Sequence, residues 1–314
     1  MSRFLIPLLI VFALLLPGVA APVRARVESC AATPAATPGV PQTFPVSARD
    51  DLGREVTITA APERIISLAP SNTEILYALD LGSTIVALDA YSDYPPAVAD
   101  VPRVGDYVDP DLEEIVAFAP DLVLLTSVHE ATLLPRLEEM HIPAAVLEPL
   151  TLDATLADIG LVGALTGATA ASDQLTCQLE ARIAAVERAL AGAPAPRVFF
   201  ELSPDLYTAG KGSYIDDLLT HARGTNIVGS EGGPWPQISA EALIAADPEV
   251  ILLADHEAGV TPESVAERPG WDVVSAVKNG RIVSLDSNLV ARPGPRVVDG
   301  LDAIARALHP DLAP

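Results

Sequence analysis

The chain has 314 residues, half of them hydrophobic, which is enough for two ordinary domains with cores of their own. Its formal net charge of −23 argues against a nucleic-acid partner, because binding to phosphates needs a basic surface. An acidic surface keeps a protein soluble and suits a basic partner surface, but charge alone names no function.

The N-terminal residues have the pattern of a secretory signal peptide, which we expect within residues 1–29. Arg3 supplies the positive charge, and residues 4–16 form an apolar stretch, interrupted by Pro7, that is too short to span a bilayer comfortably. Cleavage is compatible with the small residues of "GVA", which end at Ala20. The mature protein is then extracytoplasmic, either secreted into the periplasm or anchored by lipid to the outer face of the cytoplasmic membrane.

The two cysteines, Cys30 and Cys177, suggest different roles. Cys30 precedes an Ala/Thr/Pro-rich stretch, expected to be a flexible tether over residues 30–55, so it is a candidate lipidation site. Simple secretion is an equal alternative, because the preceding "VES" matches the usual small-residue lipidation signal poorly. A disulfide between the two would tie a flexible tail to a helix, so we expect Cys177 to be a free buried thiol.

From residue 64 onward, short apolar runs alternate with helical patterns, which predicts an α/β chain with parallel sheets. An N-terminal lobe is expected over residues 56–168. Ser71 and Glu74 have the spacing of a capping box and predict the start of its first helix. Strands are predicted at 64–68, 84–88, 122–125 and 144–148, and helices at 71–79, from 112 onward and at 133–140.

Residues 153–191 contain no strand pattern. One helix is predicted over 156–167, and a second over 172–192, where apolar residues recur at helical spacing. About twenty helical residues make a rod of roughly 30 Å, the width of a small domain. We therefore expect a rigid bridging helix over residues 169–194.

The alternation then resumes, and a C-terminal lobe is expected over residues 195–314. Its strands are predicted at 197–201, 226–228, 250–253 and 280–286, and its helices at 214–222, from 240 onward and at 296–308.

Two phrases of the sequence repeat in the same order in both halves. In "LEEIVAFAPDLVLL" Glu113 precedes Pro120 by seven positions, and in "AEALIAADPEVILL" Glu241 precedes Pro248 by seven. Upstream of these, "GSTIV" at Gly82 corresponds to "GTNIV" further on. An internal duplication predicts two similar Rossmann-like lobes joined by the long helix, with a ligand cleft between them. The alternative is that any two βαβ units look alike.

Aromatic residues gather in the loops that follow the predicted strands. In open α/β sheets such loops form the ligand site, beyond the carboxyl ends of the strands. Rings that face a cleft suit a large, flat, partly apolar ligand, and the flanking "YPP" and "PWP" segments hold them in place. The alternative is that the rings are structural and pack against their own lobes, where they hold the loops in place, as we expect for Tyr94. The candidates are Tyr91, Tyr107, Trp235 and, in a third loop, Tyr207.

Two arginines lie in "ARPGPR", at residues 291–296. Arg292 is a candidate ligand contact, because its guanidinium can donate hydrogen bonds to amide or phosphate oxygens. Arg296 is expected to be solvated or to lie at the start of the last helix.

Signatures of an enzyme are missing from the sequence. Its five histidines show no metal-binding spacing, and neither Gly-x-Ser-x-Gly nor a complete phosphate loop occurs. "AGKGS" at residues 209–213 is expected to be a turn into the next helix. We therefore expect neither an enzyme nor a resident cofactor or metal.

Three segments, "YSDYPP", "PWPQIS" and "ARPGPR", resemble those of a known protein class. From about residue 62 to 308 the chain is similar to the helical-backbone substrate-binding proteins of ABC importers, and within that class to the cobalamin-binding branch. The resemblance implies a monomer that binds its ligand reversibly, with small lobe motions. It also implies that Glu113 and Glu241 meet arginines of a membrane permease, and that a corrinoid is contacted by Tyr91, Tyr107, Tyr207, Trp235, Arg292 and Asn288.

The sequence departs from this class at several positions. Tyr107 and Tyr207 stand where the best-known cobalamin receptors have other aromatic residues, and Asn288 replaces an acidic contact. The segment "TSVHE" at 126–130 lacks a tryptophan found in that region. A receptor for a ferric siderophore or haem is therefore the alternative within this architecture, and a secreted two-lobed enzyme is the alternative from another class.

Overall fold

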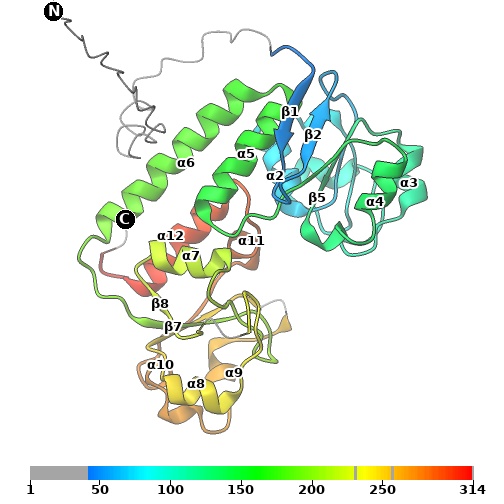
Figure 1. Cartoon of the computed structure of the whole chain (residues 1–314). Coiled ribbons are helices and arrows are strands. Elements are labelled where there is room, and N and C mark those ends of the chain that lie inside the picture. The colour runs from blue at the N-terminus through cyan, green and yellow to red at the C-terminus, as the bar shows by residue number, and fades with distance from the viewer. Residues whose placement is uncertain (1–41, 230–231, 256–257, 313–314) are drawn as a thin grey trace, which may run out of the picture.

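The computed structural model describes residues 42–229, 232–255 and 258–312. The predicted signal peptide and Cys30 lie outside the described residues. Figure 1 shows two lobes that lie apart from each other, with long helices running between them. None of the helices in the described ranges is long and apolar enough to cross a membrane.

Each lobe contains a parallel four-stranded sheet, which confirms the predicted α/β class. The sheets are ordered β4-β3-β5-β6 and β8-β7-β9-β10. If the strands of each sheet are numbered along the chain, the spatial order is 2-1-3-4 in both lobes. This identical order supports the duplication inferred from the repeated phrases. The strands are β3 (Ile65–Ser67), β4 (Ile85–Leu88), β5 (Leu122–Leu125) and β6 (Ala144–Val146), then β7 (Arg197–Glu201), β8 (Thr225–Asn226), β9 (Val250–Leu253) and β10 (Ile282–Ser284).

Short helices cover the sheets, and longer ones connect the lobes. The N-terminal lobe has α2 (Pro70–Ala78), α3 (Leu112–Ala117) and α4 (Leu134–Glu139). The C-terminal lobe has α7 (Tyr214–His221), α8 (Ala240–Ala246), α9 (Pro262–Ala266), α10 (Ser275–Lys278) and α11 (Ser287–Val290). The connecting helices are α5 (Leu152–Thr166) and α6 (Thr169–Ala189), and the last helix, α12 (Val297–Leu308), packs on α6, α7 and α11.

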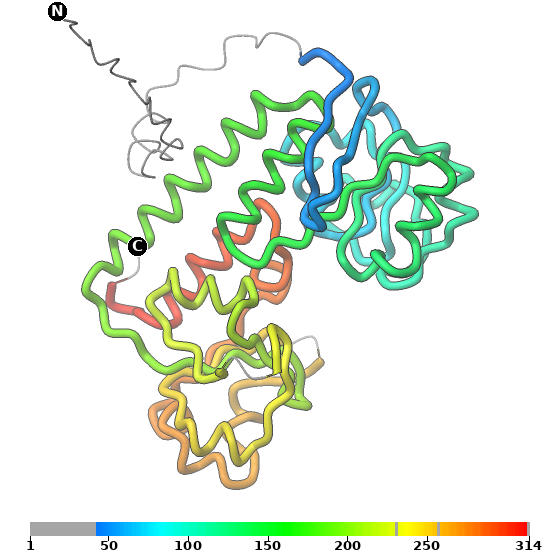
Figure 2. Tube along the Cα trace, viewed as in Figure 1, coloured from blue at the N-terminus to red at the C-terminus, as the bar shows by residue number. Residues whose placement is uncertain are grey.

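The helices α5 and α6 pack closely side by side. Gly167 ends α5 in the left-handed conformation, at φ 81°, and α6 begins two residues later. A Cβ atom on Gly163 would lie 2.1 Å from Oγ of Ser172, so only glycine permits this approach. Figure 2 shows α12, at the red end of the chain, returning to lie beside the long helices.

Both faces of each sheet are buried, which is why the strands have continuous apolar sequences. Successive residues of β5 alternate between two clusters: Leu122 and Leu124 face the connecting helices, whereas Val123 and Leu125 face α3 and α4. The outer face of the second sheet has its own cluster around Trp271. The inner faces of both sheets belong to one continuous apolar cluster, which also contains side chains of α2, α5, α6, α7 and α12.

Three local expectations prove wrong. Residues predicted to belong to the flexible tether form the antiparallel hairpin of β1 (Val46–Arg49) and β2 (Glu55–Ile58). The capping box of Ser71 and Glu74 is not formed, because α2 begins after Ala69 without a side-chain cap. Cys177 is disulfide-bonded and only half-buried, rather than a free buried thiol.

Asp158 is a buried carboxyl group on α5. Its Oδ2 atom has no hydrogen-bond partner among the described residues. Burial, and then the negative charges of Asp51 and Glu148, raise the pKa of Asp158 to about 9. The folded protein therefore holds this proton at neutral pH, whereas the unfolded chain releases it above its ordinary pKa of 3.8.

Asp158→Asn is expected to stabilise the protein increasingly as the pH rises from about 5 to about 8. Because the folded state keeps a proton that the unfolded state loses, Asp158 lowers the free energy of unfolding by about 1.4 kcal/mol per pH unit in this window. Asparagine keeps the shape and carries no charge. Urea unfolding of both proteins across the window measures the difference, and Asp153→Asn, an exposed acid of the same helix, is the control. Parallel pH profiles for parent and Asp158→Asn would contradict the argument.

Candidate binding cleft

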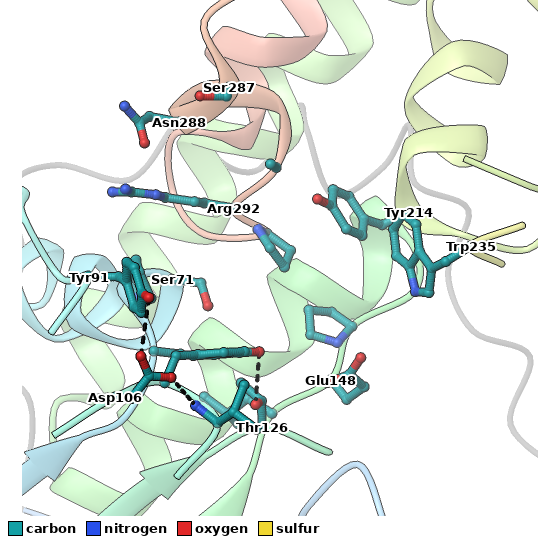
Figure 3. A pocket seen from close by; sticks show the side chains of 18 residues that line it. Ser71, Tyr91, Asp106, Thr126, Glu148, Tyr214, Trp235, Ser287, Asn288 and Arg292 are labelled. Atoms are coloured by element: carbon teal, nitrogen blue, oxygen red, sulfur yellow. Dashed lines mark hydrogen bonds between the residues drawn. The ribbon is translucent and has the colours of Figure 1, made fainter. Parts of the chain in front are cut away.

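A cavity of about 600 Å³ lies between the two lobes. Its N-terminal wall is built from loops that follow β3, β4, β5 and β6, at the carboxyl ends of that sheet, where open α/β sheets bind ligands. Its C-terminal wall comes from the start of α7, the loop before α8, and α11 with the loop after it. Figure 3 shows how these side chains converge from both lobes.

Tyr91 forms part of the N-terminal wall, and its ring is 56% exposed. Its backbone N–H donates to Oδ1 of the buried Asp89 at 2.7 Å, and its hydroxyl donates to Oδ2 of Asp106 at 3.1 Å. The hydrogen bond to Asp106 and the charge of that carboxylate raise the pKa of Tyr91. Burial raises the pKa of Asp89, which also accepts from Ser92 at 2.5 Å. The exposed ring is therefore held from two sides.

Tyr107 lies half-buried beside Tyr91 and is fixed by the loop after β5. Its hydroxyl hydrogen-bonds Oγ1 of Thr126 at 3.1 Å, and its carbonyl lies 2.7 Å from Nε2 of His129. The His129 ring meets the Tyr107 ring edge-on at 5.8 Å. Burial lowers the pKa of His129, so this imidazole is neutral and structural at physiological pH.

Trp235 and Tyr214 form the aromatic part of the C-terminal wall. Their rings meet edge-on at 5.6 Å, with Tyr214 buried and Trp235 41% exposed. The loop that carries Trp235 lies against Gly210, whose N–H donates to the carbonyl of Pro234 at 2.8 Å. A Cβ atom at Gly210 would lie 2.2 Å from the carbonyl oxygen of Gly233. Here "AGKGS" is a turn that seats the tryptophan loop and begins α7, as predicted.

Arg292 and Asn288 extend the C-terminal wall from the region of α11. Figure 3 shows both above Tyr91. Nη1 of Arg292 lies 2.5 Å from Oδ1 of Asp93 and 3.6 Å from Oε1 of Glu74, so this cation already has two anionic partners in the N-terminal lobe. The hydrogen bond from Arg292 lowers the pKa of Asp93.

A second ion pair, which shares Glu74 with the first, joins the lobes. Glu74, on α2, is 3% exposed and accepts hydrogen bonds from Nε and Nη2 of Arg296 at 2.8 and 2.5 Å. The guanidinium of Arg296 also lies 3.9 Å from the centre of the Tyr94 ring. The adjacent Gly294 packs on the backbone of Ser71, where an added Cβ would lie at 3.2 Å. Arg296 therefore lies at the start of α12, as one of the two expectations had it, but its side chain makes an interlobe contact and is not solvated.

The structure brings most of the predicted ligand contacts together and adds lining residues that the sequence did not reveal. Tyr207 is the exception: it is 48% exposed and is not among the described residues that line the cavity. Tyr214 and Glu148 line the cavity without having been predicted. Tyr91, Tyr107, Trp235, Asn288 and Arg292 all line it.

Glu113 and Glu241 project from equivalent positions, one on each lobe. Each is exposed in the first turn of a helix that precedes the third strand of its sheet. Asp111 caps α3 by accepting from the N–H of Glu113 at 2.8 Å, and Ser239 caps α8 by accepting from Ala242 at 3.2 Å. Both side chains are exposed and lie outside the cavity, and hydrogen bonds from its own backbone and from Ser239 lower the pKa of Glu241.

The described residues contain no group of three or more side chains suited to a metal ion.

A family model described as "Periplasmic binding protein" matches residues 65–289. The chain is 32% identical to the "Uncharacterized ABC transporter substrate-binding lipoprotein YvrC" of Bacillus subtilis, over 86% of this chain and 87% of that protein. It is 28% identical to a "Cobalamin-binding protein" of Halobacterium salinarum, over 85% of this chain and 74% of that one. Among solved structures, the periplasmic haem-binding protein RhuT of Roseiflexus superposes with a TM-score of 0.72 and 28% identity, over 81% of this chain and all of that chain.

Proposed function

The chain belongs to the periplasmic binding protein family, whose members are substrate-binding proteins of ABC importers rather than enzymes, and on this premise we propose that it captures cobalamin or a related corrinoid. The receptor acts as a monomer outside the cytoplasm and delivers its ligand to a membrane permease. One relative bears the name lipoprotein, but Cys30, the predicted lipidation site, lies outside the described residues. Cys177 is disulfide-bonded and Cys30 is the only other cysteine, so a lipid on Cys30 and this disulfide within one chain exclude each other.

The observation that carries the corrinoid proposal is the pair of aromatic walls. Tyr91 and Tyr107 on one lobe face Trp235 and Tyr214 on the other, across a cavity of about 600 Å³. Each ring is fixed by hydrogen bonds or ring contacts of its own, so little side-chain entropy is lost on binding. Aromatic walls held in place on both sides, with polar groups beside them, suit a flat macrocycle that carries polar substituents at its edge.

A receptor for haem or a ferric siderophore is the second candidate. The superposition on a haem-binding protein supports it, because the same two-lobed frame accommodates another flat macrocycle.

Titration with cyanocobalamin tests the proposal. We expect the secreted protein, with Cys30 retained, to bind it at micromolar concentration or tighter, with quenching of Trp235 fluorescence and a measurable heat of binding. Haemin and a ferric siderophore are titrated in parallel. Absence of cyanocobalamin binding, with tight binding of one of the others, would assign the cleft to the second candidate.

Trp235→Ala is expected to weaken cyanocobalamin binding by about 1 to 3 kcal/mol, because an aromatic anchor packed on the ligand is removed. Trp271→Phe is the matched control for the fluorescence signal, since Trp271 is buried in the outer core of the C-terminal lobe. If Trp235→Ala bound the ligand with parental affinity, Trp235 would have a structural role only.

The docking proposal concerns the two exposed glutamates outside the cavity. Glu113 and Glu241 lie at matched helix starts, and we assign to them the contact with basic residues of the permease. The caps at Asp111 and Ser239 fix both helix starts, so the two carboxylates form a rigid pair of contacts, one on each lobe.

A further inference from the structure

Two acidic side chains, Asp106 and Glu148, line the cavity without an ion pair among the described residues. Asp106 uses Oδ1 to accept from the N–H of Val108 at 3.0 Å and Oδ2 to accept from Tyr91. Glu148 uses only Oε2, which accepts from the N–H of Ser127 at 3.1 Å. Its Oε1 has no hydrogen-bond partner in the described part of the protein, and Figure 3 shows Glu148 on the side of the cavity nearest Tyr214 and Trp235.

The cationic side of the cavity is already neutralised. Arg292 is the one basic residue among the described residues that line it, and it lies between Asp93 and Glu74. Glu74 in turn pairs with Arg296, so two guanidinium groups face two carboxylates. No net positive charge from this cluster is left for an anionic ligand.

A further carboxylate lies directly behind Glu148 and strengthens the negative potential. Oδ2 of Asp51 accepts the backbone N–H of Glu148 at 2.6 Å. Asp51, which is not among the described residues that line the cavity, therefore adds a second negative charge close to Glu148.

We propose that Glu148 is a specificity residue, which selects ligands with neutral N–H donors at their edge and disfavours ligands with carboxylates there. This inference rests on the proposed function of the cleft. An amide N–H can donate a charge-assisted hydrogen bond to the open Oε1 atom. A carboxylate at the same place meets like charge in a partly desolvated site. A corrinoid edge is rich in neutral amides, whereas haem carries two propionates.

The test compares ligands that differ by a single charge. Cyanocobalamin and its monocarboxylic acids, in which one edge amide is hydrolysed, are titrated by calorimetry against the parent protein and Glu148→Gln. We expect the parent to bind at least one monocarboxylic isomer about 10 to 100 times more weakly than cyanocobalamin, with a gap that narrows at high salt. Glu148→Gln should close most of this gap, because glutamine can donate to the ligand carboxylate. Glu139→Gln, an exposed acid on α4 with the same charge change, should keep it.

Equal binding of amide and acid by the parent, or an unchanged gap in Glu148→Gln, would overturn the inference while leaving the corrinoid proposal intact. Two ferric siderophores, a cationic hydroxamate and an anionic catecholate, test charge selection in the opposite case, in which cyanocobalamin does not bind. If cyanocobalamin does not bind but the cationic siderophore alone does, the corrinoid proposal fails and charge selection stands. If cyanocobalamin does not bind and either haemin or the anionic catecholate binds tightly, both proposals fail. Both also fail if none of these ligands binds.

Discussion

Glu74→Gln is expected to lower the free energy of unfolding by about 3 to 5 kcal/mol. Glu74 is almost fully buried and receives two hydrogen bonds from Arg296, whose side chain is 19% exposed. Glutamine keeps the size but removes the charge, so a largely buried guanidinium is left without its anionic partner. Urea unfolding at neutral pH measures the loss.

Asp93→Asn is the matched control within the same cluster. It also removes one carboxylate that pairs with an arginine across the lobes, but Asp93 is 62% exposed, so its loss should cost less than about 1 kcal/mol. If both variants lost the same small amount, the buried pair would add no net stability to the junction between the lobes.

Glu113→Lys combined with Glu241→Lys is expected to abolish transport while cyanocobalamin affinity stays within about twofold of the parent, since neither residue lines the cavity. Reversed charges repel the basic permease residues that we assign to these contacts, and like charges across an interface cost several kcal/mol. Uptake of labelled ligand by cells that depend on this receptor measures transport. Calorimetry on the purified variant measures binding.

The control must change the net charge equally without touching the proposed contacts. Glu114→Lys with Glu267→Lys does so, because both residues are exposed, one on each lobe, and lie outside the matched positions. Transport should largely persist in this control. Loss of ligand binding in the Glu113/Glu241 variant, or equal loss of transport in both, would refute the division between binding and docking residues.

The sheets were predictable because strands buried on both faces give continuous apolar runs. The hairpin of β1 and β2 was not, because its strands have only four residues each, half of them exposed, and lie next to an Ala/Thr/Pro-rich tail. Glu74 was misassigned for a different reason. Ser-x-x-Glu fits a helix cap as well as a buried ion pair, and the deciding partner, Arg296, lies 222 positions away in the chain.

The aromatic walls could be predicted in part, because the rings lie in loops at strand ends. Tyr214 was missed because the first residue of a helix gives no sign of which side chain it will contact. Tyr207 also lies in a loop that follows a strand, but its backbone forms a β-bridge with Gln237. It is not among the described residues that line the cavity. Glu148 follows a strand directly, and only the three-dimensional placement of Ser127 and Asp51 shows that one of its oxygens remains open.

The continuous apolar cluster shared by the two lobes has a kinetic consequence. Swinging one lobe away from the other would expose side chains of α5, α6, α7 and α12, at about 25 cal/mol for each square ångström of apolar surface. We therefore expect a stiff frame, in which an arriving molecule meets walls that stand close to their final separation. The rate of capture is then governed by diffusion and by steric entry past the rim, without the delay of a closing motion.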